Sequence, residues 1–339
     1  PMQRQRRRLG APPPPPAAAA TTDADKRVHE STGLSMSANG GWSHIISFSG
    51  VSDCTQVMSL VCKAFLRAAS ALPRSAKFGL TLLGGADAFS LDKIRAAHAR
   101  FPALHDVVVE VDGDWGIVVP GLQLLLPQLA GFTSITELSL RYQGLMSFPA
   151  SLCALTGMKK LNLNGNKIAT LPDAIGDLKE LTELNVDCNQ LTALPDTLGA
   201  LVGLTELRAF NNKLTTLPDS IAALTQMKTL TLGTNKFTTL PKPIVKLTSL
   251  TELGLSDNQL VTLPDSIAAL TLMETLYLYG NKFTTLPKPI VKLTSLTKLY
   301  LMRNQLVTLT DSMAALTALE KLYLHDNPLA KPQSSTVEA

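Results

Sequence analysis

The feature that most constrains this chain of 339 residues is a pattern that recurs every 23 residues from residue 135 onward. It reads LxxLxLxxNxLxxLPxxIxxLxx, and its copies begin at Ile135, Met158, Leu181, Leu204, Met227, Leu250, Met273, Leu296 and Leu319. A fixed period of this length indicates that each repeat is one supersecondary unit. Eight full repeats and a partial ninth therefore predict that residues 135–331 stack into one elongated solenoid.

The order of apolar residues within the fifth repeat assigns a structure to each part of the unit. Leu230 and Leu232 alternate around Thr231, and this period of two predicts a short strand. Asn235 closes the strand, and Pro241 favours an extended turn over a helix in the return segment. Each repeat offers five or six aliphatic side chains, worth roughly 1.5–3 kcal/mol each when buried. No repeat can bury them alone, so the units must stack with a parallel sheet on the concave side.

An asparagine stands at one fixed position after the strand, and this column predicts a ladder of buried amides. Stacked amide side chains can hydrogen-bond the backbone of adjoining turns. They thereby provide partners for backbone N–H and C=O groups that burial would otherwise leave without a hydrogen bond. The first repeat has Gln143 at this position, and the later repeats have Asn166, Asn189, Asn212, Asn235, Asn258, Asn281, Asn304 and Asn327.

With these motifs the chain resembles the leucine-rich repeat family over residues 135 to about 331. Its LPxxIxxL form is similar to the intracellular, Ras-associated class and to the plant relatives of that class. The resemblance implies an α/β leucine-rich repeat solenoid that is curved, with a parallel sheet on the concave face and short irregular or 3-10 return segments. It also implies a cytoplasmic signalling scaffold or adaptor that binds another protein, without identifying that partner.

A near-exact duplication shows which surface of the solenoid varies. Residues 227–272 and 273–318 differ at eleven of 46 positions, and eight of these flank the strand leucines. In a strand, the residues between the core leucines face the opposite side of the sheet. The scaffold thus stays constant while the exposed strand face changes, as expected when that face carries binding specificity.

The second copy places aromatic residues on this face. Tyr277, Tyr300 and Tyr323 share one position of three consecutive repeats and predict a ladder; Tyr279, Met302 and His325 predict a second column. Tyrosine, arginine and methionine are typical of binding surfaces. The predicted partner-binding residues are Tyr277, Tyr279, Tyr300, Met302, Arg303, Tyr323, His325, Lys298, Lys321, Arg208 and Phe210.

The earlier repeats form an acidic half with Glu137, Glu183, Glu206 and Glu252. The alternative interpretation is that the tyrosines stack only for stability.

A segment before the repeats, residues 42–69, has a different pattern. Asp53 predicts a helix N-cap, and apolar residues then recur at helical spacing. The segment resembles the latter part of an F-box, which implies a Skp-type adaptor contacted by Ile45, Ile46, Phe48, Val61 and Phe65. Ser49 stands where the family usually has leucine. Two interpretations remain open: an F-box substrate receptor of a cullin-RING (SCF) ubiquitin ligase, or a helical cap on the first repeat.

The rest of the chain completes the predicted domain organisation. Residues 1–33 form a basic, Pro- and Ala-rich disordered tail, 34–74 the F-box-like helical segment, 75–134 irregular repeats or a cap, and 332–339 a C-terminal tail. Within 75–134 the pattern predicts a helix over 91–101 and a strand over 104–111.

The composition excludes several classes of function. The net charge of +4 is accounted for by residues 1–27, so the rest of the chain is neutral and has no overall basic excess for nucleic acid. No apolar run is long enough to span a membrane, and no catalytic, phosphate-binding or metal-ligand motif occurs.

We expect a monomeric, non-enzymatic protein without cofactors. Four cysteines without CxxC spacing indicate reduced thiols in the cytoplasm, with the nucleus as the alternative. Its partner is another protein: a small GTPase, a signalling protein or a ubiquitination substrate.

Overall fold

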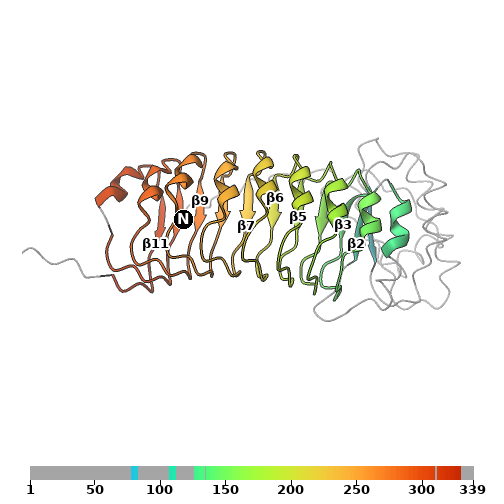
Figure 1. The fold of residues 1–339 in the computed structure, drawn as a ribbon, viewed down its shortest axis with the longest axis horizontal. Coiled ribbons are helices and arrows are strands. Elements are labelled where there is room, and N and C mark those ends of the chain that lie inside the picture. The colour runs from blue at the N-terminus through green and yellow to red at the C-terminus, as the bar shows by residue number, and fades with distance from the viewer. Residues whose placement is uncertain (1–77, 83–106, 112–125, 134, 310, 330–339) are drawn as a thin grey trace, which may run out of the picture.

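The described part of the chain is built around one parallel sheet whose strands follow each other in chain order (Figure 1). This computed structural model describes residues 78–82, 107–111, 126–133, 135–309 and 311–329. The first three strands have five residues each: β1 Phe78–Leu82, β2 Val107–Val111 and β3 Ile135–Ser139. The other eight have three residues each: β4 Lys160–Asn162, β5 Glu183–Asn185, β6 Glu206–Arg208, β7 Thr229–Thr231, β8 Glu252–Gly254, β9 Thr275–Tyr277, β10 Lys298–Tyr300 and β11 Lys321–Tyr323.

The return segments contain 3-10 helices, as the sequence predicts. They are η2 Leu126–Gly131, η3 Ala150–Ala154, η4 Asp173–Asp177, η5 Asp196–Ala200, η6 Asp219–Ala223, η7 Lys242–Lys246, η8 Asp265–Ala269, η9 Lys288–Lys292 and η10 Asp311–Ala315. In η6, Pro218 occupies the N-cap with φ −64° and ψ 145°, which suits the restricted ring of proline. The turn ends at Leu224, whose N–H donates to Ile221 O. One turn of 3-10 helix is sufficient to send the chain back to the sheet.

The strict period places the same repeat position at the same register in neighbouring strands. Leu230 pairs with Leu253, and Leu253 pairs with Leu276. The leucines of these strands are 0% exposed, and Phe237 and Phe283 fill the core below them. A continuous apolar column therefore runs along the inside of the solenoid, as the sequence predicts.

The asparagine column forms the predicted ladder. Asn235 Oδ1 accepts from the Leu214 N–H at 2.9 Å, and its Nδ2 donates to Ala209 O at 2.9 Å and to Leu232 O at 3.0 Å. Each amide therefore joins its own turn to the preceding repeat. In the first repeat Gln143 stands at this position, and its side-chain amide donates to Arg141 O at 3.0 Å.

Some sequence predictions concern the N-terminal side of the array. Within the strand predicted over 104–111, the described residues Val107–Val111 form β2, which pairs with both β1 and β3. The sequence pattern does not predict β1. The helix predicted over 91–101, the F-box-like segment 34–74 and the tails 1–33 and 332–339 lie outside the described residues.

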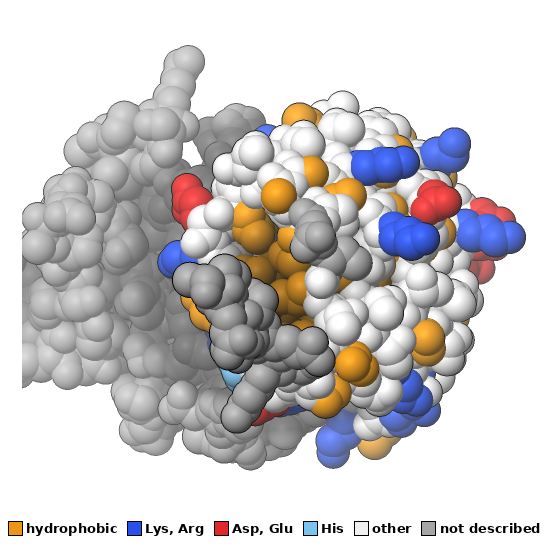
Figure 2. Space-filling view, turned by 90° about the vertical axis from the view of Figure 1, so that its left-hand side faces the viewer, with side chains coloured by type: hydrophobic (Ala, Val, Ile, Leu, Met, Phe, Trp, Pro, Cys, Tyr) orange, Lys and Arg blue, Asp and Glu red, His pale blue; other side chains and the backbone are white. Residues whose placement is uncertain are grey.

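The last strand marks the other end of the described array. Figure 2 looks onto this end and shows hydrophobic side chains gathered there. Leu322 of β11 is 37% exposed, whereas the equivalent Leu299 of β10 is 0% exposed. Among the described residues, no helix has the length and apolar character needed to cross a membrane.

Candidate functional site

Strand geometry determines which side chains reach the exposed side of the sheet. In β9 the middle residue, Leu276, is buried, while Thr275 and Tyr277 on either side of it are half-buried. The same alternation holds in β10. We call the surface formed by these outward positions the sheet face.

The three tyrosines of the first column form a stack. Tyr277 pairs in register with Tyr300, and Tyr300 with Tyr323. Their ring centroids are 4.6 and 4.7 Å apart, with interplanar angles of 19° and 6°. This separation matches the roughly 4.7–4.9 Å between neighbouring strands, so each ring stays above its own strand. Burial and, after it, the charge of Glu252 raise the pKa of Tyr277, which keeps the phenol protonated.

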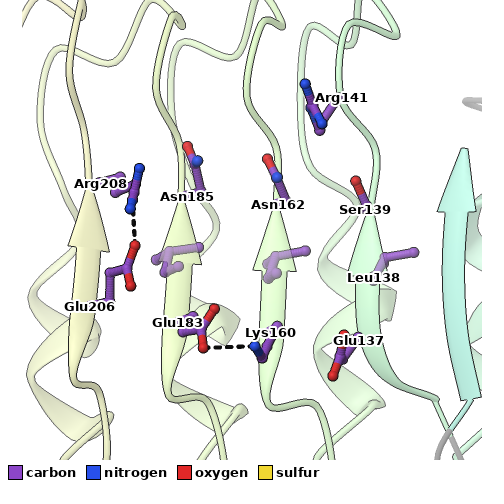
Figure 3. Close-up of a pocket in the computed structure, with 12 residues that line it drawn as sticks. Glu137, Leu138, Ser139, Arg141, Lys160, Asn162, Glu183, Asn185, Glu206 and Arg208 are labelled. Carbon is purple, nitrogen blue, oxygen red and sulfur yellow. Dashed lines mark hydrogen bonds and ion pairs between the residues drawn. The ribbon is translucent and has the colours of Figure 1, made fainter. Parts of the chain in front are cut away.

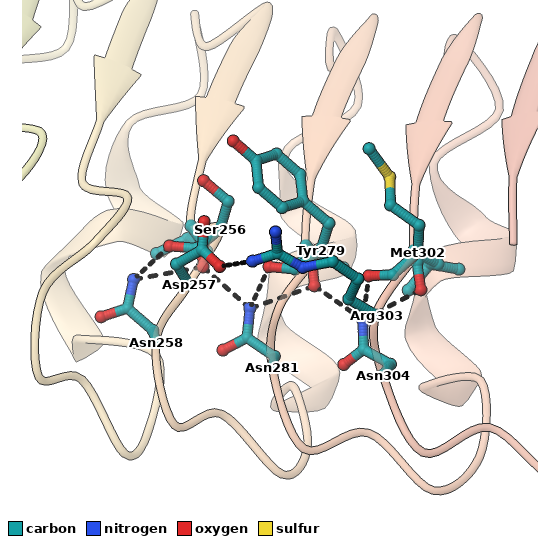
Figure 4. A network of polar contacts seen from close by, with 11 residues as sticks. Ser256, Asp257, Asn258, Tyr279, Asn281, Met302, Arg303 and Asn304 are labelled. Atoms are coloured by element: carbon teal, nitrogen blue, oxygen red, sulfur yellow. Dashed lines mark hydrogen bonds and ion pairs between the residues drawn. The ribbon is translucent and has the colours of Figure 1, made fainter. Parts of the chain in front are cut away.

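The second column lies beside the stack and contains Tyr279, Met302 and His325. The backbone brings these three repeats together: the Gly280 N–H donates to Met302 O, and the Arg303 N–H donates to His325 O. Figure 4 shows Tyr279 and Met302 rising from the same side of the sheet. We define Tyr277, Tyr279, Tyr300, Met302 and Tyr323 as the tyrosine patch.

An ion pair crosses the edge of this patch. Arg303 is paired with Asp257, two repeats away, and its guanidinium carbon lies 5.8 Å from the centre of the Tyr279 ring (Figure 4). The intervening repeat has Gly280 at the equivalent position, with φ of 67°. A Cβ added there would lie 2.1 Å from Asp257 Oδ1, so only glycine leaves room for the pair. The sequence analysis names Arg303 but misses Asp257 and Gly280, which single-repeat patterns do not connect.

The remaining predicted residues divide into two groups. Lys298 and Lys321 occupy matching register positions in the neighbouring strands β10 and β11, two residues before Tyr300 and Tyr323, as the sequence predicts. Arg208 and Phe210 belong to β6 and the residues after it, and the strands β7 and β8 separate them from β9. The structure therefore does not bring these two residues into the tyrosine patch. Phe210 instead lies over Gly233, where an added Cβ would be 3.0 Å from its ring.

The acidic half is less acidic than the glutamate column suggests. Lys160 stands in register between Glu137 and Glu183 and pairs with Glu183 at 2.8 Å, while Arg208 pairs with Glu206 (Figure 3). The hydrogen bond that Lys160 donates to the Glu183 carboxylate raises the pKa of Lys160. These residues line an open groove of about 380 Å³ on the sheet face. The glutamate column of the predicted acidic half is present, and two of its four carboxylates, Glu183 and Glu206, have an ion-pair partner on the same face.

Family comparisons agree with this geometry. A model described as leucine-rich repeat region matches residues 119–253, and a leucine-rich repeat model matches 226–283, 248–306 and 271–329. The chain is a leucine-rich repeat protein. Proteins of this family are typically non-enzymatic binding modules and generally mediate protein–protein binding. No curated protein is significantly similar in sequence to this leucine-rich repeat protein.

Solved structures show the same fold. A leucine-rich repeat protein of Leptospira interrogans is 28% identical with a TM-score of 0.57, over 77% of this chain and 64% of that one. The ectodomain of a plant membrane receptor kinase from Arabidopsis thaliana is 24% identical with a TM-score of 0.57, over 75% and 30%. An internalin of Listeria monocytogenes is 17% identical with a TM-score of 0.60, over 91% and 84%. This chain thus spans less than two thirds of the first two proteins.

Proposed function

We propose that this leucine-rich repeat protein binds another protein through the tyrosine patch, as a cytoplasmic signalling scaffold or adaptor. The observation that carries the proposal is the pair of stacked ring contacts at 4.6 and 4.7 Å, flanked by Met302 and Arg303. Exposed aromatic side chains near a flexible methionine and an arginine are the composition of binding hot spots.

The duplicated unit supports binding over a purely stabilising role for the tyrosines. The upstream copy has Thr231 and Gly254 where the downstream copy has Tyr277 and Tyr300. Its strands β7 and β8 nevertheless pair in the same register, and their leucines are as fully buried. The tyrosines are therefore not needed to build a repeat of this type.

A related fold offers a parallel for this mode of binding. The Arabidopsis ectodomain was solved in complex with Casparian strip integrity factor 2. At 24% identity this likeness concerns the fold, so it supports the general use of such a solenoid for holding another polypeptide.

The duplication also supplies a variant for testing the proposal. Tyr277→Thr combined with Tyr300→Gly installs the residues that the upstream copy already accommodates. We expect recovery of protein partners on the immobilised full chain to fall at least about tenfold, since a hot spot contributes about 2 kcal/mol or more. Leu272→Ala, at a residue 53% exposed and away from the strands, is the matched control. Undiminished recovery by the double variant, with an unchanged far-UV circular dichroism spectrum, would refute the proposal.

The ubiquitin-ligase alternative depends on the F-box-like segment, residues 34–74, outside the described part of the chain. Its prediction is co-purification of the full chain with a Skp-type adaptor and a cullin. Substitution of Ile46 and Phe48 by alanine should then remove the adaptor without changing partner recovery by the solenoid.

A further inference from the structure

The open groove over β3 to β6 is a second surface on which the sheet face can hold a ligand (Figure 3). Its volume of about 380 Å³ lies within the roughly 300–1,000 Å³ of ligand pockets. Strands β7 and β8 separate it from β9, the first strand of the tyrosine patch. The groove is therefore distinct from the tyrosine patch, although both lie on the same face of the sheet.

Two asparagines stand side by side in this groove. Asn162 of β4 pairs in register with Asn185 of β5, and Figure 3 shows both side chains in the same orientation. Asn162 Oδ1 accepts a hydrogen bond from the Asn164 N–H at 3.0 Å. Asn185 Oδ1 accepts the equivalent bond from the Asp187 N–H at 2.9 Å. Since a backbone N–H can only donate, these bonds fix which atom of each amide is the oxygen and which is the nitrogen. We call the groove that contains this pair the amide groove.

The two side-chain nitrogens are free to donate to a ligand. Neither Nδ2 has a hydrogen-bond partner among the described residues, and both asparagines are only half-buried. Because the two side chains share one conformation on neighbouring strands, their nitrogens are separated by about 4.7–4.9 Å. One carbonyl oxygen at about 2.9 Å from each nitrogen would receive the two bonds at an angle of about 110°. This angle suits the two lone pairs of a single carbonyl oxygen.

The charges of the groove favour an uncharged acceptor over a carboxylate. Three acidic and three basic side chains line the groove, so its charges balance. Four of these residues are already engaged in the pairs Lys160–Glu183 and Arg208–Glu206. A ligand carboxylate at the amide pair would also lie close to Glu183, which precedes Asn185 by two residues on the same face of β5. Like charges at this separation repel each other, whereas a neutral carbonyl avoids the repulsion.

The same glutamate can accept a hydrogen bond from the ligand. Glu183 is 42% exposed, and Lys160 Nζ, at 2.8 Å, is its side-chain partner within the described part of the chain. An ionised carboxylate has about four acceptor positions, so others remain available. A side-chain carboxamide carries its oxygen and its NH2 group on one carbon, and can therefore reach the asparagine pair and Glu183 together. A trans main-chain amide directs its C=O and N–H to opposite sides and cannot do so.

We propose that the amide groove binds a side-chain carboxamide, of glutamine or asparagine, in the protein partner. The carbonyl oxygen of this group accepts from Asn162 Nδ2 and Asn185 Nδ2, and its NH2 group donates to Glu183. Because these bonds replace bonds to water, the groove contributes selectivity more than affinity. This inference rests on the proposed function, because it takes the ligand to belong to a protein bound on the sheet face.

Three defined peptides test the groove. The probes are acetylated, amidated Gly-Gly-Gln-Gly-Gly and the same peptide with leucine or glutamate at its centre, titrated onto the full chain and followed by ligand-observed nuclear magnetic resonance. Leucine removes both hydrogen-bonding groups, and glutamate replaces the donor by a charged acceptor. We expect the glutamine peptide to bind about fivefold more tightly than either of the others. Equal binding of the glutamine and leucine peptides, or tighter binding of the glutamate peptide, would overturn the proposal.

Variants of the asparagine pair separate the groove from non-specific peptide binding. Asn162→Thr combined with Asn185→Thr installs the residue that β7 carries at the equivalent Thr231, and should reduce the preference for glutamine to less than about twofold. Asn211→Thr is the matched control, since Asn211 does not line the groove and the equivalent Thr234 has nearly the same φ, 52° against 53°. This control should keep the full preference. Retention of that preference by the double variant, with an unchanged far-UV circular dichroism spectrum, would contradict the assignment.

The outcomes also distinguish this inference from the proposed function. If the three peptides bind equally but partner recovery still depends on Tyr277 and Tyr300, only the assignment of the amide groove is wrong. If the glutamine preference is present but partner recovery ignores Tyr277 and Tyr300, only the proposed function is wrong.

Discussion

The asparagine ladder predicts a large stability loss from one small substitution, Asn235→Ala. Asn235 is 8% exposed, and its Oδ1 is the acceptor for the Leu214 N–H. Its Nδ2 donates to the carbonyl oxygens of Ala209, Leu232 and Gly233. Alanine removes all of these bonds.

The contacts that remain determine the size of the effect. Each of the three carbonyls keeps a second donor, from Asn212 Nδ2, Asn258 Nδ2 and the Asn211 N–H respectively. Among the described residues the Leu214 N–H has no other partner, and a buried unsatisfied donor costs about 1–3 kcal/mol. With roughly 0.5–1.5 kcal/mol more for the lost amide bonds, the free energy of unfolding should fall by about 2–4 kcal/mol.

Urea denaturation followed by far-UV circular dichroism measures this loss. Gln259→Ala is the matched control, because Gln259 is exposed next to the equivalent Asn258 of the following repeat, and it should change the unfolding free energy by less than about 0.5 kcal/mol. A loss below about 1 kcal/mol for Asn235→Ala would refute the account of the ladder as an essential set of backbone contacts.

Three further outcomes follow from burial and charge. Leu278→Ala, at a side chain 0% exposed below the tyrosine patch, should lower the unfolding free energy by about 2–5 kcal/mol, whereas Leu272→Ala should have little effect in the same denaturation assay. Burial, and to a smaller extent the charge of Asp177, raises the pKa of the Cys153 thiol to about 11. Mass-spectrometric mapping after alkylation at pH 8 should therefore find Cys188 modified much faster than Cys153 in the folded protein. Arg303→Gln removes a largely exposed ion pair and should change stability by at most about 1 kcal/mol.

The repeat architecture could be predicted from the sequence because each position of the 23-residue unit has one structural role. The leucines on either side of Thr231 indicate the strand, Asn235 its end and Pro241 the return turn. Since the period never changes over nine repeats, equal positions must stack, and this also predicts that Tyr277 lies against Tyr300. The structure confirms both expectations.

Interactions between different columns could not be predicted in the same way. The ion pair between Arg303 and Asp257 spans 46 residues and requires Gly280 between them, so no single repeat reveals it. Lys160 is visible in the sequence, but its effect on Glu183 becomes clear only when neighbouring repeats are aligned side by side. Strand β1 has Leu80 and Leu82 on either side of Thr81, but it lacks the leucine three residues before Leu80 and the asparagine three residues after Leu82 that identify the regular repeats.

Site-specific photo-crosslinking tests the central claim most directly, because it reports which face of the solenoid touches a partner. A benzoylphenylalanine residue is placed in the full chain at position 302, in the tyrosine patch, or at position 272, at an exposed site away from the strands. We predict that a protein partner crosslinks from position 302 and not from position 272. Crosslinking from position 272 alone, or equally from both positions, would contradict recognition by the sheet face.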